Sequence, residues 1–216
     1  MKWMDNIKAI VGKRVLDAQI KNTSRMPAIC TIEEAKRIGI IYNATEYVSF
    51  EIIRNLVKDL SHESKKVTVL GYVDSKKLID NYLYRKGFDF FSKNELNWYY
   101  RPSSPVVDDF IKEPFDILIN LSLEDYFPIR YITALSPATF KTGKYNPDDI
   151  TLDLMIDIEK EKQTMRNLQK EIVKEGAQQH EISEIEADME KKTETEIQLN
   201  FLINQLLHYL SVLKSK

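Results

Sequence analysis

Polar side chains able to bind a small ligand stand close to the ends of several apolar runs in the sequence. An apolar run of strand length predicts a buried strand, and open parallel sheets bind ligands outside the carboxyl ends of their strands. Amide, hydroxyl and carboxyl groups at that edge would orient a polar ligand, and a lysine would pair with an anion. The candidate ligand-binding residues are Asn43, Thr45, Asp74, Asn120, Ser122 and Lys141.

Several of these candidates also have a structural interpretation. Thr45 and Ser122 precede predicted helices, where a capping hydroxyl contributes about 0.5–2 kcal/mol without any function. Asn43 can form an Asx turn with the backbone that follows it. Asn120 lies inside an apolar run, where a polar side chain needs a partner, and it is the hardest of the set to explain structurally. The sequence leaves both interpretations open.

Motifs for catalysis and cofactor binding are not found. The sequence contains no G-x-x-x-x-G-K-[ST] phosphate loop, no G-x-G-x-x-G fingerprint and no G-x-S-x-G nucleophile elbow. Cys30 is the only cysteine and has no histidine near it in sequence, so an incidental or buried thiol is favoured over a nucleophile. The three histidines lie far apart, without metal-ligand spacing. We predict no metal site and no cofactor, assign no catalytic residue, and leave enzymatic activity open.

Residues 82–100 combine eight aromatic side chains with interleaved lysines and arginines. This mixture can stack single-stranded bases, and it can equally form a small apolar cluster under a long connection. Packing is favoured, because several of the aromatic residues fall where the fold needs apolar contacts. The net charge of −2 also argues against a surface built for nucleic acid, so a nucleic-acid partner is not expected.

Strand-like and helix-like patterns alternate through the middle of the chain. Short apolar runs predict strands at 37–42, 66–73, 88–91, 97–100, 115–121, 138–142 and 152–158. Apolar residues at three- and four-residue spacing predict helices at 2–22, 45–60, 75–85, 104–113, 124–135 and 196–213. Such alternation predicts an α/β fold, a three-layer sandwich with a mostly parallel, Rossmann-like or flavodoxin-like sheet.

Charge and composition divide the chain into four parts. Residues 1–30 hold an amphipathic helix and a connection, with six basic and two acidic residues, and residues 31–158 form the α/β domain. Residues 159–192 are predicted to form a charged helical insertion, and residues 193–216 a C-terminal helix that packs on the domain. Within the insertion, residues 181–190 hold five acidic residues and no basic one, beside a short heptad-like apolar seam.

The N-terminal helix and the insertion are the two places where a partner could bind. A basic amphipathic helix can bind a membrane surface or a partner, although packing against its own domain is favoured here. Opposite charges on the N-terminal helix and on the insertion make either a dimer or a self-packed arrangement conceivable. We expect any protein partner or homo-oligomer contact to involve residues 160–192 or the N-terminal helix.

The sequence is typical of a cytoplasmic protein. No stretch approaches the roughly 18 apolar residues of a membrane span. Residues 1–19 carry charges throughout and lack the uninterrupted apolar core of a signal peptide. The single cysteine excludes a disulfide framework. A cytoplasmic location without a membrane span is therefore expected.

Several strings in the sequence resemble a known family. The most specific are FDILINLS at 115–122 and ALSPATFKTG at 134–143, with NELNWYYRP and DLMIDI as further matches. They are similar to a family of Bacteroidetes proteins that carry a domain of unknown function. The resemblance covers roughly residues 25–158 and the last helix, and it brings no activity, substrate or cofactor. It implies a recurring patch of Asn120, Ser122, Ser136, Lys141 and Gly143.

Two hypotheses for function follow from these observations. The preferred one is a non-catalytic interaction or scaffold protein, because no catalytic constellation is found and two charged helical segments flank the domain. The alternative is a binding protein or enzyme for a small polar or anionic ligand, with its site at the carboxyl ends of the strands. A deep pocket that encloses Asn120, Ser122 and Lys141 would favour the ligand hypothesis, and a filled rim would favour the interaction hypothesis.

Overall fold

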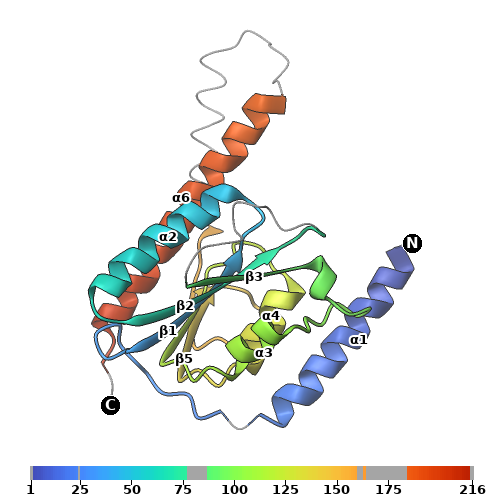
Figure 1. Ribbon diagram of the computed structural model, residues 1–216, viewed down its shortest axis with the longest axis horizontal. Helices are drawn as coiled ribbons and strands as arrows, with labels where there is room; N and C mark the ends of the chain where they lie inside the picture. The colour runs from blue at the N-terminus through green and yellow to red at the C-terminus, as the bar shows by residue number, and fades with distance from the viewer. Residues whose placement is uncertain (1, 24, 77–86, 160–162, 164–183, 215–216) are drawn as a thin grey trace.

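The computed structural model describes residues 2–214 except 24, 77–86, 160–162 and 164–183. Helices and strands alternate along most of the chain (Figure 1). The strands are β1 (Arg37–Asn43), β2 (Lys66–Val73), β3 (Phe88–Ser92), β4 (Ile117–Asn120), β5 (Phe140–Lys144) and β6 (Leu154–Ile156). The helices are α1 (Lys2–Lys21), α2 (Tyr47–His62), the short 3-10 helix η2 (Lys93–Glu95), α3 (Pro105–Lys112), α4 (Phe127–Leu135) and α6 (Glu184–Val212).

The six described strands form one parallel sheet in the order β3-β2-β1-β4-β5-β6. The chain moves outward from β1 to β3, then crosses back and moves outward from β4 to β6. This is the doubly wound order in which ligands bind where the direction reverses, here between β1 and β4. The predicted three-layer α/β fold is confirmed, and the order is the Rossmann-like one of the two alternatives.

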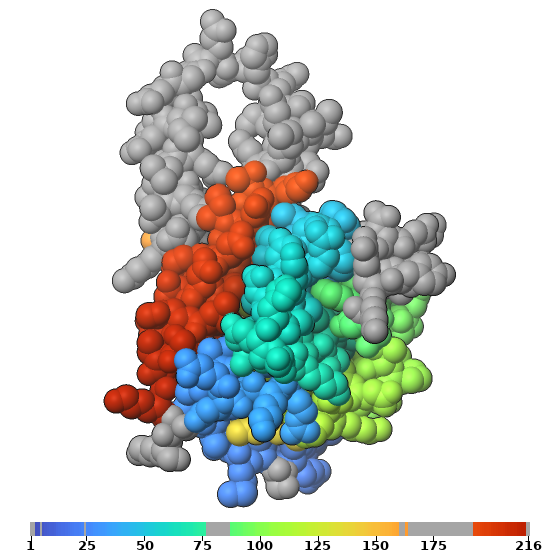
Figure 2. Space-filling model, turned by 60° about the vertical axis from the view of Figure 1, so that its left-hand side comes forward, coloured from blue at the N-terminus to red at the C-terminus, as the bar shows by residue number. Residues whose placement is uncertain are grey.

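Helices cover both faces of the sheet. Helices α2 and α6 lie side by side on one face, as Figures 1 and 2 show. Helices α3 and α4 pack on the other face, and α1 packs on α4 from outside. Burial on both faces is why β1 and β4 read as continuous apolar runs instead of alternating with polar residues. The α2/α6 side of the core includes Ile38, Ile40, Phe50, Leu202 and Leu206, and the α3/α4 side includes Ile41, Leu70, Val107, Phe110 and Ile129.

The aromatic segment divides between core and surface. Phe91 is fully buried, and Phe88 and Phe90 pack against the ring of Phe50 at centroid distances of 5.4 and 6.3 Å. Trp98, by contrast, is largely exposed. This part of the chain therefore packs on both sides of the sheet, with Phe88 and Phe90 beneath α2 and Phe91 on the α3/α4 side.

The structure differs most from the sequence prediction at two elements, beside smaller shifts in the bounds of others. Residues 97–100 form a turn instead of a strand, with Tyr100 at a positive φ of 66° and one isolated bridge between Leu96 and Pro102. Helix α6 begins at Glu184, well before residue 196, so it starts inside the segment 159–192 that the sequence assigns to an insertion. The helix predicted at 75–85 and the rest of that insertion lie largely outside the described residues.

Candidate functional site

Three of the predicted site residues meet at the carboxyl ends of β1 and β2. Asn43 Oδ1 accepts hydrogen bonds from the Thr45 amide at 3.1 Å and from Thr45 Oγ1 at 2.6 Å. Thr45 Oγ1 in turn accepts a hydrogen bond from the Asp74 amide at 2.8 Å. Asn43 Nδ2 donates to the hydroxyl of Tyr126 at 3.3 Å, which extends the network to the connection after β4. These polar groups hold the strand-end loops to one another.

The capping roles predicted for Thr45 and Ser122 are wrong. Helix α2 begins after Glu46, and no side chain caps it. The Thr45 hydroxyl instead donates to Asn43 and accepts from the Asp74 amide. Helix α4 begins after Tyr126, and Ser122 Oγ instead donates to the carbonyl of Glu124 at 2.7 Å. The Asx turn predicted at Asn43 does form. Both hydroxyls therefore shape the loops that precede the helices.

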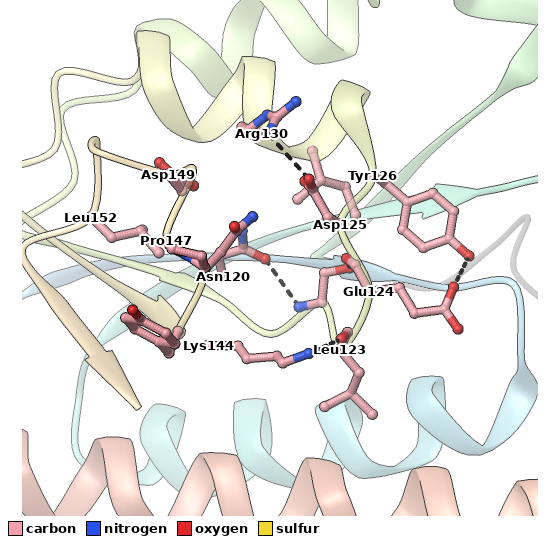
Figure 3. A pocket seen from close by; sticks show the side chains of 14 residues that line it. Asn120, Leu123, Glu124, Asp125, Tyr126, Arg130, Lys144, Pro147, Asp149 and Leu152 are labelled. Atoms are coloured by element: carbon pink, nitrogen blue, oxygen red, sulfur yellow. Dashed lines mark hydrogen bonds and ion pairs between the residues drawn. The ribbon is translucent and has the colours of Figure 1, made fainter. Parts of the chain in front are cut away.

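A polar pocket of about 230 Å³ lies at the carboxyl ends of β4 and β5, and Asn120 and Ser122 line it (Figure 3). Asn120 Oδ1 accepts a hydrogen bond from the Ser122 amide at 3.0 Å. The two basic side chains of the pocket are also engaged: Arg130 pairs with Asp125 at 3.1 Å, and Lys144 Nζ donates to the carbonyl of Leu123 at 2.8 Å. Asn120 Oδ1, Arg130 and Lys144 thus each already interact with another group of the protein.

Lys141 does not join this rim. It is the second residue of β5, its side chain is 1% exposed, and Nζ donates to the carbonyl of Ala134 near the end of α4 at 2.9 Å. Burial, followed by the nearby positive charge of Arg25, lowers the pKa of the Lys141 ammonium group to about 7. Since Lys141 does not line the pocket that holds Asn120 and Ser122, the three residues do not form one site.

Two tyrosines that sequence reasoning missed join the strand-end network. The Tyr72 hydroxyl donates to Asp74 at 2.8 Å, and the Tyr126 hydroxyl donates to Glu124 at 2.9 Å. Their rings meet at a centroid distance of 5.5 Å. Burial, together with hydrogen bonds to these carboxylates, raises the pKa of both phenols above the ordinary value. Both therefore stay protonated and act as donors. Nothing in the sequence indicates this, because Tyr72 lies in an apolar strand and Tyr126 lies far from it, in the connection before α4.

A second pocket, of about 240 Å³, lies at the reversal of strand order. Its described lining comes from the end of β1 and the connection after it, the start of α2, the connection after β4 and the middle of α6. We call it the switch-point pocket. It is lined by Asn43, Glu46, Ser49, Leu121, Leu123, Glu124, Glu194, Thr195, Gln198 and Leu199.

The described residues give little support for a metal site or for a reactive thiol at Cys30. Within the ranges that the structure describes, no three His, Cys, Asp or Glu side chains are grouped so that they could hold a metal ion. Cys30 is partly buried, and burial followed by the negative charges of Asp116 and Glu34 raises the pKa of its thiol. A raised pKa keeps the thiol protonated at neutral pH, which makes it a poor nucleophile.

Helix α1 carries apolar residues on two separate sides. Leu16 packs against Tyr131 and Ala134 of α4, which confirms that the second half of the helix rests on the domain. Trp3, Ile7 and Ile10 lie elsewhere on the helix and are 66%, 44% and 52% exposed. We call these three residues the outer stripe. None of the described helices is both long and apolar enough to cross a bilayer.

The attachment of α1 depends on a close approach at Gly12. A Cβ atom there would stand 2.6 Å from the carbonyl oxygen of Tyr99 and 3.0 Å from Cζ of Phe127. Gly12→Ala should therefore loosen α1 by about 1–3 kcal/mol through overpacking, although alanine is the better helix former by about 1 kcal/mol. Hydrogen exchange of the α1 amides should accelerate while exchange in the sheet stays unchanged. Equal or slower α1 exchange, relative to a Lys13→Ala control, would contradict the packing described.

Comparison with known families identifies one family that the sequence of the chain matches. Residues 8–174 match a family described as "Family of unknown function (DUF6913)". The chain belongs to this family. The DUF6913 match includes every strand of the sheet and most of α1, and it ends before the described α6 begins. It confirms the resemblance to a domain of unknown function, and membership in DUF6913 brings no activity with it. No curated protein and no solved structure matches the chain.

Proposed function

We propose that this protein is a non-catalytic interaction protein that associates with a second copy of itself through the outer stripe of α1. The single observation that carries the proposal is the exposure of Trp3, Ile7 and Ile10 on a helix whose other side is already packed. The strand-end network supports it indirectly, because Asn43, Thr45 and Asn120 are bonded within the protein. A cytoplasmic location is part of the proposal and rests on the lone cysteine.

The outer stripe has the geometry of a helix–helix contact. Residues 3, 7 and 10 are separated by four and three positions, so at about 100° per residue they share one side of the helix. Arg14 continues the same spacing, and Lys13 lies next to it; both are exposed and form no ion pair with a described residue. An apolar stripe with basic neighbours suits a helix that carries apolar residues beside acidic ones.

The charges of two segments of the chain indicate which part of the second copy would contact α1. Residues 1–30 hold six basic and two acidic residues, so pairing of two α1 helices would bring like charges together. Residues 181–190 hold five acidic residues and no basic one, and α6 begins within them at Glu184. The start of α6 and helix α1 lie on opposite sides of the molecule (Figure 1), so they can meet only between two chains.

Reciprocal contacts would close the dimer. Each copy has one α1 helix and one start of α6. In a dimer with a two-fold axis, α1 of each copy contacts the start of α6 of the other copy, so both contacts form and no further copy can be added. The contact combines an apolar stripe with opposite charges. Association should therefore weaken as salt is added, because exposed charges are screened within about 8 Å at physiological ionic strength.

Sedimentation velocity at micromolar concentration tests the proposal. The wild-type chain should form a dimer that dissociates partly at high salt. The double variant Ile7→Ser/Ile10→Ser should weaken the dimer at least about tenfold while leaving thermal stability unchanged, since both side chains are exposed. Ile150→Ser is the matched control, because Ile150 is 86% exposed outside α1 and should have no effect.

Two results would overturn the proposal. One is a wild-type chain that stays monomeric at all salt concentrations. The other is a monomer that binds vesicles of anionic phospholipid through Trp3, Ile7 and Ile10, since a basic amphipathic helix can also serve a membrane surface. Loss of vesicle binding in Ile7→Ser/Ile10→Ser, with no change in oligomeric state, would identify that case.

A further inference from the structure

A further pocket lies between helix α1, the segment that follows β3 and the start of α4. Its volume is about 440 Å³, within the roughly 300–1,000 Å³ of small-molecule sites. It lies beside the carboxyl end of β2, on the side of a parallel sheet at which ligands bind. We call it the aromatic pocket, because five of its lining residues carry aromatic rings: Tyr72, Trp98, Tyr100, Tyr126 and Phe127.

Two tyrosines form the inner end of the aromatic pocket. Tyr72 is buried, and its ring meets the ring of Tyr126 at a centroid distance of 5.5 Å. The Tyr72 hydroxyl donates to Asp74 and the Tyr126 hydroxyl donates to Glu124, so the polar ends of both side chains are engaged. The raised pKa values of both phenols keep their rings neutral. The surface that a ligand would meet here is therefore aromatic and uncharged.

A turn with an unusual backbone presents Trp98 at this pocket. The indole is 61% exposed, and the ring of Tyr99 holds it edge-on at a centroid distance of 5.1 Å. The next residue, Tyr100, has a positive φ of 66°, which a bulky side chain rarely adopts. Asn97 Oδ1 accepts hydrogen bonds from the amides of Tyr99 and Arg101 and so keeps the turn in this form. A strained turn that holds a large apolar ring in contact with water indicates that the ring serves binding.

The charges of the aromatic pocket balance one another. Two carboxylates and two lysines are the charged groups of its described lining. Asp74 pairs with Lys93 at 2.9 Å, and Asp125 pairs with Arg130 of α4 at 3.1 Å. The second lining lysine, Lys8 of α1, lies over an aromatic ring of the pocket at 5.7 Å from the ring centroid. The pocket therefore has no net charge that would select an ion, and its aromatic surface favours a neutral ligand.

We propose that the aromatic pocket binds a small molecule through a neutral planar aromatic ring. Aromatic rings attract one another in offset-stacked or edge-to-face pairs with centroids about 4.5–7 Å apart. The exposed ring of Trp98 and the rings of Tyr126 and Phe127 line the pocket and supply such partners. A saturated ring of the same size would fill the space without these pairs. The binding does not depend on self-association, because the outer stripe of α1 is not part of the described lining.

Isothermal titration calorimetry with three two-ring probes tests the proposal. The wild-type chain should bind 2-naphthol at least about fivefold more tightly than decahydro-2-naphthol, which has the same carbon skeleton without aromatic rings. Naphthalene-2-sulfonate should bind no more tightly than 2-naphthol, because the pocket carries no net positive charge. Trp98→Leu should weaken the binding of 2-naphthol at least about fivefold, because it removes the stacking surface and keeps an apolar side chain.

Trp3→Leu is the matched control. Trp3 is the other tryptophan of the chain, is 66% exposed and is not among the described lining residues. This variant should keep the wild-type affinity for 2-naphthol, and any loss of self-association in it would concern the outer stripe alone. The proposal is overturned if 2-naphthol does not bind at millimolar concentration, if decahydro-2-naphthol binds as tightly, if the sulfonate binds more tightly, or if Trp3→Leu weakens binding as much as Trp98→Leu. Thermal unfolding of both variants without probe confirms that the fold is retained.

Discussion

Replacing Lys141 with methionine is expected to remove a rise in stability of about 3 kcal/mol that the wild-type chain shows between pH 7 and pH 10. The folded protein lowers the pKa of this ammonium group from its ordinary value of 10.5 to about 7. The unfolded chain therefore binds more protons than the folded chain in this pH window. Stability must then increase as the pH rises through it, and methionine, which does not titrate, cannot contribute.

Above about pH 10 other groups make the unfolding free energy fall as the pH rises. Tyr72 and Tyr126 have raised pKa values in the folded protein, so the unfolded chain loses its phenol protons first. Stability should fall there in both proteins, and the stability of the wild-type chain should peak near pH 10. At pH 7 the variant should be within about 1 kcal/mol of the wild type, because it loses one hydrogen bond to Ala134 and no longer buries an amine.

Urea unfolding at intervals from pH 6 to pH 11 measures this difference. The quantity that decides is the slope of the unfolding free energy against pH, compared between the wild type and Lys141→Met. Parallel curves in the two proteins between pH 7 and pH 10 would show that Lys141 keeps an ordinary pKa in the folded state.

Gly39→Ala should destabilise the protein by about 2–3 kcal/mol, a large effect for a single methyl group. Gly39 lies in β1 at the centre of the sheet, and a Cβ there would stand 2.7 Å from two ring carbons of Phe115. Phe115 is itself held by Phe110 at a ring-centroid distance of 4.9 Å, so it has little room to move. The methyl group therefore forces a shift of the packed α3 side of the core.

A second substitution tests the cause. Phe115→Leu in the Gly39→Ala background should recover part of the lost stability, although Phe115→Leu by itself removes buried contacts and destabilises. The coupling free energy between the two positions should be about 1 kcal/mol or more in urea unfolding. Additive effects, or a neutral Gly39→Ala, would show that the ring does not restrict this position.

The layers of the fold could be predicted from the sequence because strands that are buried on both faces appear in it as continuous apolar runs. The residues of β2, 66–73, are predicted without error, and β1 extends only one residue beyond the predicted 37–42. Both are continuous apolar runs followed by a helical pattern. The strand predicted at 97–100 failed because its aromatic residues serve a turn with a positive φ at Tyr100, which periodicity does not detect.

The candidate site could be predicted only in part, because strand order and side-chain direction are not encoded locally. Asn43, Thr45 and Asp74 do meet, since β1 and β2 are neighbours with aligned ends. Lys141 was placed at the rim by its position after an apolar residue, whereas it lies inside β5, paired in register with Leu118.

Helix α1 illustrates the same limit. Its three- and four-residue spacing predicts one apolar stripe packed on the domain. Ile20 of that stripe does pack there, beside Leu16. The prediction is wrong for Trp3, Ile7 and Ile10 of the same stripe, which are exposed. The sequence alone cannot separate this side from the outer stripe, because the position of α4 decides which residues are covered. The exposure of Trp3, Ile7 and Ile10 is information that only the assembled fold supplies.

Native mass spectrometry of two charge-reversed variants tests the proposed self-association most directly. One variant carries Lys13→Glu/Arg14→Glu on α1, and the other carries Glu184→Lys/Glu186→Lys at the start of α6. Each should be monomeric by itself, because its reciprocal contacts bring like charges together. Mixed in equal amounts, the two should form a heterodimer in which both contacts again pair opposite charges. A mixture that stays monomeric, or variants that each dimerise as the wild type does, would contradict the account.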